Sequence, residues 1–331
     1  MPRHTKGNYT MNILRRLILG AALSLPLLAS ATESYPGKPI RLIVPFAPGG
    51  SVNLMGRLLA DNLSQRLGQQ VIVENRAGAG GLIGAELVAN SAPDGYTLLL
   101  ATMGAQSILP YLSKQLRFDP KTAFTPIGEF ASLPNVLVTA PDLPVNNLAE
   151  LAAYAKAHPG ELSMASAGIG SVNQMVGELF MLKTGTRFTH VPYKGVGPAM
   201  VDLLGGRVQI LFANVPGVAA QVKQGQLKAL GIAGNKRAAM LPDVPTMKEA
   251  GSCDCVVESW YGLMGPAGMP ADLVDRLSRE LRGVVATPAM QHMLAEQGAE
   301  PIQGTPTQFA ALIESESKRW AEVIKEAKLA E

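Results

Sequence analysis

One stretch decides the fold: Ile40-Arg-Leu-Ile-Val-Pro-Phe-Ala-Pro-Gly-Gly-Ser-Val-Asn53. Its apolar, β-branched start predicts a buried strand. A Pro-Gly-Gly turn follows, and Ser51 is a residue type that favours the start of a helix. Leucines then recur at helical spacing. The helix start would present backbone N–H groups and the positive end of the helix dipole, which together make an anion site. The alternative for this stretch alone is an ordinary turn without a ligand.

The first 31 residues have the pattern of a secretory signal peptide. Arg15-Arg16 precede the apolar run Leu17 to Leu28, and Ala29-Ser30-Ala31 matches a cleavage site. Met11 is an alternative start. We expect a mature chain from about Thr32, exported to the periplasm without a lipid anchor or a later membrane-spanning stretch.

Composition excludes some partners. Removing residues 1–31 leaves 300 residues with 25 Lys and Arg against 26 Asp and Glu, so the formal net charge falls from +3 to −1. Charge therefore gives no support to a nucleic-acid partner. A chain of this length can build a large core and two lobes. Few aromatic residues (5%) with 34 Gly and 24 Pro suit an α/β protein with many tight turns.

Strands and helices alternate in two series, which predicts a parallel sheet with helices on both faces. The segment Ala140 to Pro144 and the extended segment near Tyr261 are expected to cross between the two lobes. The C-terminal helices would then pack back on the first lobe. This organisation predicts a discontinuous first domain, residues 35–138 and 258–331, and a second domain, residues 139–257.

Small polar loops follow several predicted strands, at the edge where ligands bind in such sheets. They are Gly49-Gly50-Ser51, Thr102-Met103-Gly104 and Ser166-Ala167-Gly168. These loops offer backbone N–H and hydroxyl donors and little else, so they favour binding an anion, most simply a carboxylate, without transforming it. Two lobes could close over this ligand by a hinge motion. The alternative is that each loop only connects a strand to a helix.

Signals for catalysis, cofactors and metals are weak. The glycines of residues 78–84 do not have the dinucleotide-binding spacing, and there is no G-x-S-x-G elbow. His190 is the one histidine that we expect near the cleft. It could act as a base, or it could be a packed or capping residue without a catalytic role. Neither Ser51 nor Ser166 has an identifiable histidine partner, and no paired carboxylates stand at matching strand ends. We therefore expect no catalytic residue and no cofactor.

Cys253 and Cys255 are the only cysteines, and no histidine lies near them in the sequence. A metal site needs more ligands, so we expect none there. In an exported protein the pair could close a small disulfide ring or stay free.

Eight motifs occur in order: Tyr35-Pro-Gly-Lys-Pro-Ile, Pro45-Phe-Ala-Pro-Gly-Gly-Ser, Val73-Glu-Asn-Arg-Ala-Gly-Ala-Gly-Gly, Ala92-Pro-Asp-Gly-Tyr-Thr-Leu-Leu, Ser166-Ala-Gly, His190-Val-Pro-Tyr-Lys-Gly, Leu203-Leu-Gly-Gly-Arg-Val and Leu241-Pro-Asp-Val-Pro-Thr. Through them, the chain from about Tyr35 to Lys328 resembles the extracytoplasmic solute receptors of tripartite tricarboxylate transporters, the Bug family. Single motifs of this length occur by chance, but eight in order are specific.

The resemblance implies a type II periplasmic-binding-protein fold, an α/β architecture of two domains with a ligand cleft between them. It implies a small carboxylate ligand and delivery to a membrane permease with one large and one small subunit. The fold, and the absence of an obvious interface stripe in the sequence, lead us to expect a monomer. Carried onto this sequence, the resemblance assigns ligand binding to Pro48, Gly49, Gly50, Ser51, Asn53, Thr102, Gly104, Ser166, Gly168, Ser171, Tyr193 and Asn214.

The chain departs from the family pattern at two places. The family's first loop commonly continues Gly-Gly-Ser-Thr-Asp, but this chain has Val52 and Asn53. A later strand commonly ends Phe-Asp-Asn, but here Ala213 stands before Asn214. We take these to be two acids lost from the cleft, so we expect amino acids to bind less well than plain carboxylates.

Two other functions stay open from the sequence. One is a secreted α/β hydrolase that acts on a carboxylate or ester, with Ser51 or Ser166 as the nucleophile. The other is a carboxylate sensor that signals to a kinase instead of supplying a transporter.

Overall fold

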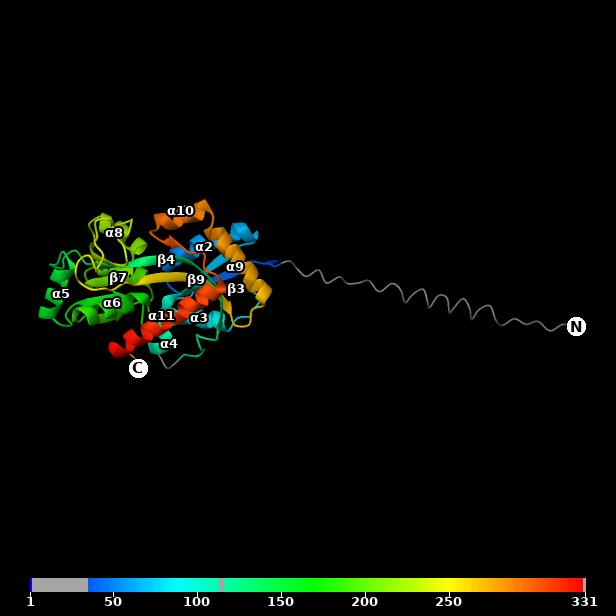
Figure 1. Cartoon of the computed structure of the whole chain (residues 1–331), viewed down its shortest axis with the longest axis horizontal. Coiled ribbons are helices and arrows are strands. Elements are labelled where there is room, and N and C mark those ends of the chain that lie inside the picture. Colours follow the sequence, from blue (N-terminus) through cyan, green and yellow to red (C-terminus); the bar gives the residue numbers. More distant parts are fainter. Residues whose placement is uncertain (2–34, 113–115, 330–331) are drawn as a thin grey trace. The chain divides into compact units, whose positions relative to one another are not determined.

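A ten-stranded β-sheet organises the chain (Figure 1). The computed structural model describes residue 1, residues 35–112 and residues 116–329. The predicted signal peptide, residues 1–31, lies outside the described residues apart from Met1. Residues Lys38–Glu331 form one compact unit, and the sheet and the helices described below belong to it.

The sheet has the strand order β2-β1-β3-β9-β4-β7-β5-β6, and β8 and β10 also pair with β4. In chain order the elements are β1 (Ile40–Val44), α2 (Ser51–Leu67), β2 (Val71–Asn75), η1 (Ala79–Gly81), α3 (Leu82–Ala89), β3 (Thr97–Thr102), η2 (Gly104–Ile108), α4 (Leu109–Leu112), β4 (Phe124–Thr139), α5 (Leu148–Ala157), β5 (Ser163–Ser166), α6 (Val172–Thr184), β6 (Thr189–Pro192), α7 (Val196–Leu204), β7 (Ile210–Asn214), η3 (Val215–Gly217), α8 (Ala219–Lys223), β8 (Lys228–Ala233), β9 (Glu258–Pro266), α9 (Ala271–Val285), α10 (Pro288–Glu296), β10 (Glu300–Pro301) and α11 (Pro306–Glu326).

The opening stretch folds as its sequence predicts. Strand β1 is buried at four of its five residues and pairs in parallel with both β2 and β3. Helix α2 begins at Ser51, directly after the Pro-Gly-Gly turn. The N-cap residue is Gly50 rather than Ser51, because the helix starts one residue earlier than a serine cap requires.

The prediction of a parallel sheet is wrong for its centre. Strand β9 pairs antiparallel with β3 and with β4, and β4 pairs antiparallel with β7 and β8. Among the pairs of described strands, β1 pairs in parallel with β2 and β3 at one end, and β5 pairs in parallel with β6 and β7 at the other. The sheet is therefore mixed: two parallel βα series are joined through long antiparallel strands.

Strand β4 is much longer than the sequence suggested. The residue pattern predicts a strand only over Asn135 to Thr139, but β4 begins at Phe124 and runs for 16 residues. Its first part contains Pro126 and Gly128, which weaken a strand signal, and its pairing with β9 is interrupted by register shifts. Residues on β4 consequently pair with β9 near its start and with β7 and β8 near its end.

The C-terminal helices pack against the N-terminal part of the chain, as expected. Helix α9 packs against α2 and β4, and α11 packs against β4 and η2. An ion pair between Arg66 and Glu280, at 2.6 Å, joins α2 to α9. The sequence Thr305-Pro-Thr-Gln308 predicts a capping box at the start of α11, and Thr305 and Gln308 form one. The exact division into two domains stays a prediction.

Two further findings bear on function. Cys253 and Cys255 form a disulfide, which settles the alternative that the sequence left open. Within residues 35–112 and 116–329, every helix is too short or too polar to cross a lipid bilayer.

Candidate ligand-binding site

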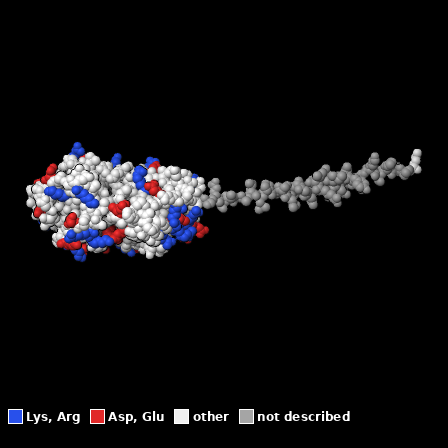
Figure 2. All heavy atoms as spheres, turned by 90° about the horizontal axis from the view of Figure 1, so that it is seen from above, with Lys and Arg blue, Asp and Glu red and all other residues white. Residues whose placement is uncertain are grey.

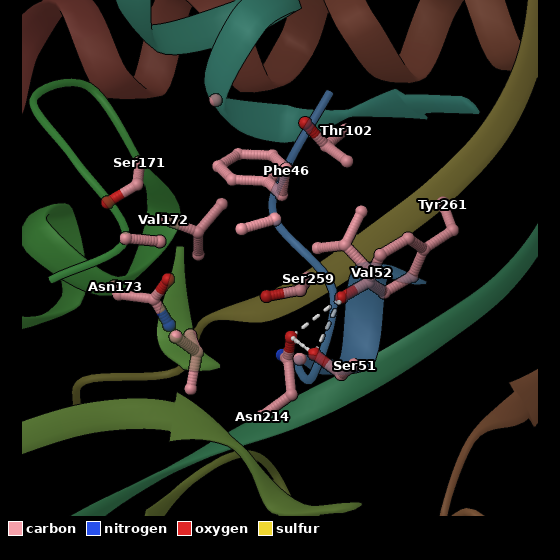
Figure 3. Close-up of a pocket in the computed structure, with 15 residues that line it drawn as sticks. Phe46, Ser51, Val52, Thr102, Ser171, Val172, Asn173, Asn214, Ser259 and Tyr261 are labelled. Carbon is pink, nitrogen blue, oxygen red and sulfur yellow. Dashed lines mark hydrogen bonds between the residues drawn. The ribbon is translucent and has the colours of Figure 1, made fainter. Parts of the chain in front are cut away.

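A cavity of about 30 Å³ lies where the loops after β1, β3 and β5 and the end of β7 meet (Figure 3). Strand β9 contributes the remaining wall. The space is small beside a ligand pocket of several hundred Å³, because loops from the two βα series lie in contact around it. The lining residues are Phe46, Ala47, Gly50, Ser51, Val52, Thr102, Gly104, Ala167, Ser171, Val172, Asn173, Val196, Asn214, Ser259 and Tyr261.

The cavity is lined by uncharged residues, but three helices start beside it. Helix α2 follows Gly50, α6 follows its N-cap Ser171, and α7 starts at the lining residue Val196. Each helix start carries backbone N–H groups without intrahelical partners and about half a positive charge. The electrostatic character of the cavity is therefore positive although no lysine, arginine or histidine of the described residues lines it.

A buried hydrogen-bond network fixes one wall (Figure 3). Ser51 Oγ donates to Asn214 Oδ1 at 2.8 Å, and Tyr261 OH donates to the same oxygen at 2.6 Å. Asn214 Nδ2 in turn donates to Asn135 Oδ1 at 3.2 Å. Burial raises the pKa of Tyr261 to about 12, so its hydroxyl stays protonated and keeps donating at neutral pH. The network joins α2, β4, β7 and β9 at this wall of the cavity.

Thr102 differs from that network because its hydroxyl is unsatisfied. The residue is buried at the end of β3 and lines the cavity, and its Oγ1 has no hydrogen-bond partner among the described residues. A buried polar group without a partner costs roughly 1–3 kcal/mol. A ligand oxygen in the cavity would supply the missing partner.

Glycines allow the loops of the two series to touch backbone to backbone. A Cβ on Gly104 would lie 2.8 Å from the carbonyl oxygen of Gly170, and a Cβ on Gly80 would lie 2.0 Å from that of Ile169. We call these contacts the first seam. In the second seam, Ala47 N donates to Lys194 O at 3.3 Å, and a Cβ on Gly197 would meet the carbonyl oxygen of Pro48 at 2.6 Å.

Several of the predicted binding residues come together at this cavity. Gly50, Ser51, Thr102, Gly104, Ser171 and Asn214 line it. Ligand binding by any of them stays a prediction.

The other predicted binding residues lie elsewhere. Pro48 and Gly49 are exposed in the turn before α2, and Asn53 donates to Asn75 Oδ1 at 3.1 Å. Gly168 and Tyr193 line a neighbouring cavity of about 430 Å³, where Tyr193 OH donates to Asp202 at 2.6 Å. The remaining residue is Ser166, whose hydroxyl is held by local hydrogen bonds.

Neither position at which the sequence analysis expected a lost acid lines the cavity. Asn53 lies on the first turn of α2 but is turned to Asn75, and Arg57 Nε donates to its Oδ1 at 3.3 Å. Ala213 is fully buried in a hydrophobic core cluster, where it pairs with Val136 of β4, and it is not among the residues that line the cavity. Only Val52 among the departures lines the cavity.

Ser166 also corrects the sequence analysis, which found no histidine partner for either serine. Its Oγ lies 2.6 Å from His190 Nε2, because β5 and β6 run in parallel and bring the two strand ends together. Burial lowers the pKa of His190, so the imidazole is neutral at pH 7. Ser166 is nevertheless 0% exposed and lines none of the described cavities. Together with the bond from Gly168 N to Ser166 Oγ, the pair holds the Ser166–Gly168 loop.

Sequence reasoning missed part of the cavity. Ser259 and Tyr261 lie on β9, which was expected only as a crossing segment. Their alternation along the strand could have placed both side chains on one face. Phe46, Val172 and Val196 had no signal beyond their position next to predicted loops. Asn173 was not predicted because it lies within the first turn of α6 and not in a loop. Its Nδ2 donates to Phe212 O at 2.8 Å.

Comparison with known proteins extends these observations. Residues 55–329 match the family described as the tripartite tricarboxylate transporter family receptor. Protein BugT of Bordetella pertussis is 40% identical over 324 residues, which cover 96% of this chain and 98% of that protein. A protein of Cupriavidus necator from the gbd 5′ region is 38% identical and covers 94% of both chains.

Several solved structures also superimpose closely on this chain. The periplasmic binding protein BugD superimposes with a TM-score of 0.85 at 37% identity, over 89% of this chain and 99% of that chain. R. palustris Rpa4515 with adipate gives 0.86 at 34% identity, over 89% and 99%. MatC from Rhodopseudomonas palustris with bound malate gives 0.83 at 32% identity, over 88% and 100%.

Proposed function

The chain belongs to the tripartite tricarboxylate transporter receptor family of periplasmic solute-binding proteins, and from this premise we propose that it captures a small carboxylate in the cavity between its loops and delivers it to a membrane permease. The proposal includes export through the N-terminal signal peptide, and action as a monomer that needs no cofactor.

The observation that carries the proposal is the meeting of three helix starts at a cavity with uncharged walls. A carboxylate placed there would accept hydrogen bonds from the N–H groups at the starts of α2 and α6, and from the unpartnered Thr102 hydroxyl. A cationic ligand would meet the same positive helix ends and no carboxylate side chain among the lining residues. The binding of adipate and of malate by two neighbours of this fold supports the choice of an acid.

The same electrostatic argument supports the exclusion of amino acids. An α-ammonium group needs an acceptor, and the lining residues offer neutral oxygens only, such as those of Ser259 and Asn173. The missing acids at residues 53 and 213 do not carry this argument, since neither position lines the cavity. We expect a plain carboxylate to bind more tightly than the amino acid of the same length.

Binding requires the cavity to open. We propose that residues 35–138 with 258–331 and residues 139–257 move as two lobes, that a ligand enters when the two glycine seams part, and that it is enclosed when they meet again. The crossing strands β4 and β9 would act as the hinge.

Catalysis is the weaker alternative. The Ser166–His190 pair is the one observation in its favour, but a nucleophile must reach its substrate, and Ser166 is inaccessible. A mature protein that hydrolyses an ester, with activity lost in Ser166→Ala, would establish the alternative.

The first experiment is a thermal-shift screen of the mature protein with mono-, di- and tricarboxylates, each paired with its amino acid. A ligand at one hundred times its dissociation constant stabilises the fold by about 2.7 kcal/mol. We expect a clear shift with one class of plain acid, reduced in Thr102→Val. The proposal fails if every acid leaves the midpoint unchanged, or if an amino acid binds more tightly than any plain acid.

Delivery needs a second experiment. Vesicles that contain the matching permease should accumulate the labelled acid only when the receptor is added outside. Tight binding without receptor-dependent uptake would favour the sensor alternative.

A further inference from the structure

The crossing strands have a second polar face, opposite the ligand cavity. Along β9, Ser259 and Tyr261 line the ligand cavity, so the alternating Glu258 and Trp260 lie on the other face of the strand. Two adjoining cavities of about 520 and 360 Å³ lie there, and Glu258 and Ser132 line both of them. We call these two cavities together the rear groove. Its size falls in the range of small-molecule sites.

One buried polar group of the rear groove lacks a hydrogen-bond partner. Trp260 is 2% exposed and lines the groove, and its Nε1 has no partner among the described residues. Such a group is rare in folded proteins unless a water or a ligand satisfies it. Ser132, which lines both cavities, adds a hydroxyl to the same groove.

The charges of the groove do not balance. Lys236 forms an ion pair with Glu300, Arg319 pairs with Glu316 at 3.4 Å, and Arg237 pairs with Glu249 at 2.8 Å. Two further carboxyls, Glu129 and Glu258, form no ion pair with any described cation. The charged residues that line the groove are Glu129, Lys236, Arg237, Glu258, Glu300, Glu316 and Arg319.

The pKa shifts of these two carboxyls agree with this imbalance. Burial, and then the charge of Glu258, raises the pKa of Glu129 to about 7. Burial, and then the charge of Glu300, raises the pKa of Glu258, although Lys236 and the backbone N–H of Asn235 act against the shift. Both carboxyls would gain from a cation that enters the groove.

We propose that the rear groove binds a small organic compound that carries both an ammonium group and a hydroxyl or carbonyl oxygen. The ammonium group would pair with Glu129 and Glu258, and the oxygen would accept from Trp260 Nε1 or bond to the Ser132 hydroxyl. An ammonium fits better than a metal ion, because no group of three His, Cys, Asp or Glu in the described residues is placed to hold one. The site is independent of the carboxylate cavity and does not rest on the function proposed for it.

Isothermal titration of the mature protein with ethanolamine, at about pH 8, tests the proposal. Ethylene glycol lacks the charge and propylamine lacks the oxygen, so the first should not bind and the second should bind several-fold more weakly. The Glu129→Gln/Glu258→Gln variant should lose affinity by at least about tenfold, since each partly buried charge pair contributes on the order of tenfold. Glu322→Gln, which removes an exposed charge from α11, is the matched control and should bind as the wild type does.

The pH dependence provides a second measurement. Ethanolamine affinity should rise between about pH 6 and pH 8 as Glu129 ionises, and this rise should vanish in Glu129→Gln. The proposal is overturned if ethanolamine does not bind at concentrations up to about 10 mM, or if the double variant binds as tightly as Glu322→Gln. Binding of Mg²⁺ in place of the amine would equally overturn it. Circular dichroism confirms that each variant is folded before titration.

Discussion

Gly104→Ala should separate ligand affinity from fold stability. Gly104 starts the helical turn η2, and its backbone does not need a positive φ, so alanine fits the conformation of the residue itself. The added methyl lies 2.8 Å from Gly170 O across the first seam, where an ordinary contact is 3.4 Å or more. The seam must therefore open by about half an ångström, and overpacking of this kind costs about 1–3 kcal/mol.

This cost applies only where the seam is closed. If binding requires closure, Gly104→Ala should weaken carboxylate binding by roughly 5- to 150-fold. Alanine also favours helical backbone by up to about 1 kcal/mol over glycine. The ligand-free protein, in which the seam is free to part, should consequently unfold at the same urea concentration as the wild type or a higher one. A variant that binds the acid more weakly, yet resists urea at least as well as the wild type, is the result that the closure mechanism predicts.

The assay is titration of the acid identified in the thermal-shift screen, with urea unfolding of the same samples. Gly197→Ala in the second seam should behave in the same way, since its Cβ would meet Pro48 O at 2.6 Å. Gly205→Ala is the control: the residue is exposed at the end of α7, and its Cβ would contact only carbonyls of its own helix. Wild-type affinity in both seam variants would refute the reasoning that closure encloses the ligand.

Three further variants test the groups around the cavities. Thr102→Val removes an unsatisfied buried hydroxyl, so the ligand-free protein should gain about 1 kcal/mol in urea unfolding while carboxylate affinity falls about tenfold; unchanged affinity would exclude Thr102 from binding. Tyr261→Phe deletes the 2.6 Å bond to Asn214 and should cost about 1–2 kcal/mol of unfolding free energy, whereas Tyr154→Phe, whose hydroxyl makes no side-chain hydrogen bond within the described part of the chain, should cost little. Glu129→Gln tests a pH dependence. Because the pKa of Glu129 is about 7 in the folded protein and 4.5 is its ordinary value, the free energy of unfolding of the wild type should fall as the pH rises between these two values. The variant should become the more stable protein by up to about 3 kcal/mol at pH 8 and gain little at pH 4, and an equal gain at both pH values would contradict the shift.

The sequence predicted the parts of the fold whose signals are local. Strand β1, the glycine turn after it and the capped start of α11 depend on neighbouring residues and were found at the right places. The first part of β4 was missed because Pro126 and Gly128 weaken its strand pattern, and its stability comes from pairing with β9, more than a hundred residues later in the chain. The antiparallel centre of the sheet could not be predicted for the same reason, since strand direction is set by those distant partners.

The site was partly predictable on the same grounds. Glycines and small polar residues at strand ends marked Gly50, Ser51, Thr102 and Gly104, because the chemistry that they provide is largely backbone chemistry. No sequence pattern indicated Tyr261 as part of the site. Its role depends on a hydrogen bond to Asn214, which lies close to it only in the folded chain.

The departures from the family pattern show how a comparison of motifs misleads without geometry. Asn53 replaces an acid, but it faces Asn75 and not the cavity, and Ala213 lies in the core. Val52 looks like the milder change, since it replaces only a threonine, yet it is the one departure that lines the cavity. Its methyl groups stand where the family places a hydroxyl donor, beside the N–H groups at the start of α2. A ligand atom that contacts Val52 therefore meets an apolar surface, whereas its carboxylate still meets the helix end. The choice among acids should consequently depend on the atoms next to the carboxylate: a hydrogen or methyl there suits Val52 better than a hydroxyl, because a hydroxyl would lose its water without gaining a partner from this side chain.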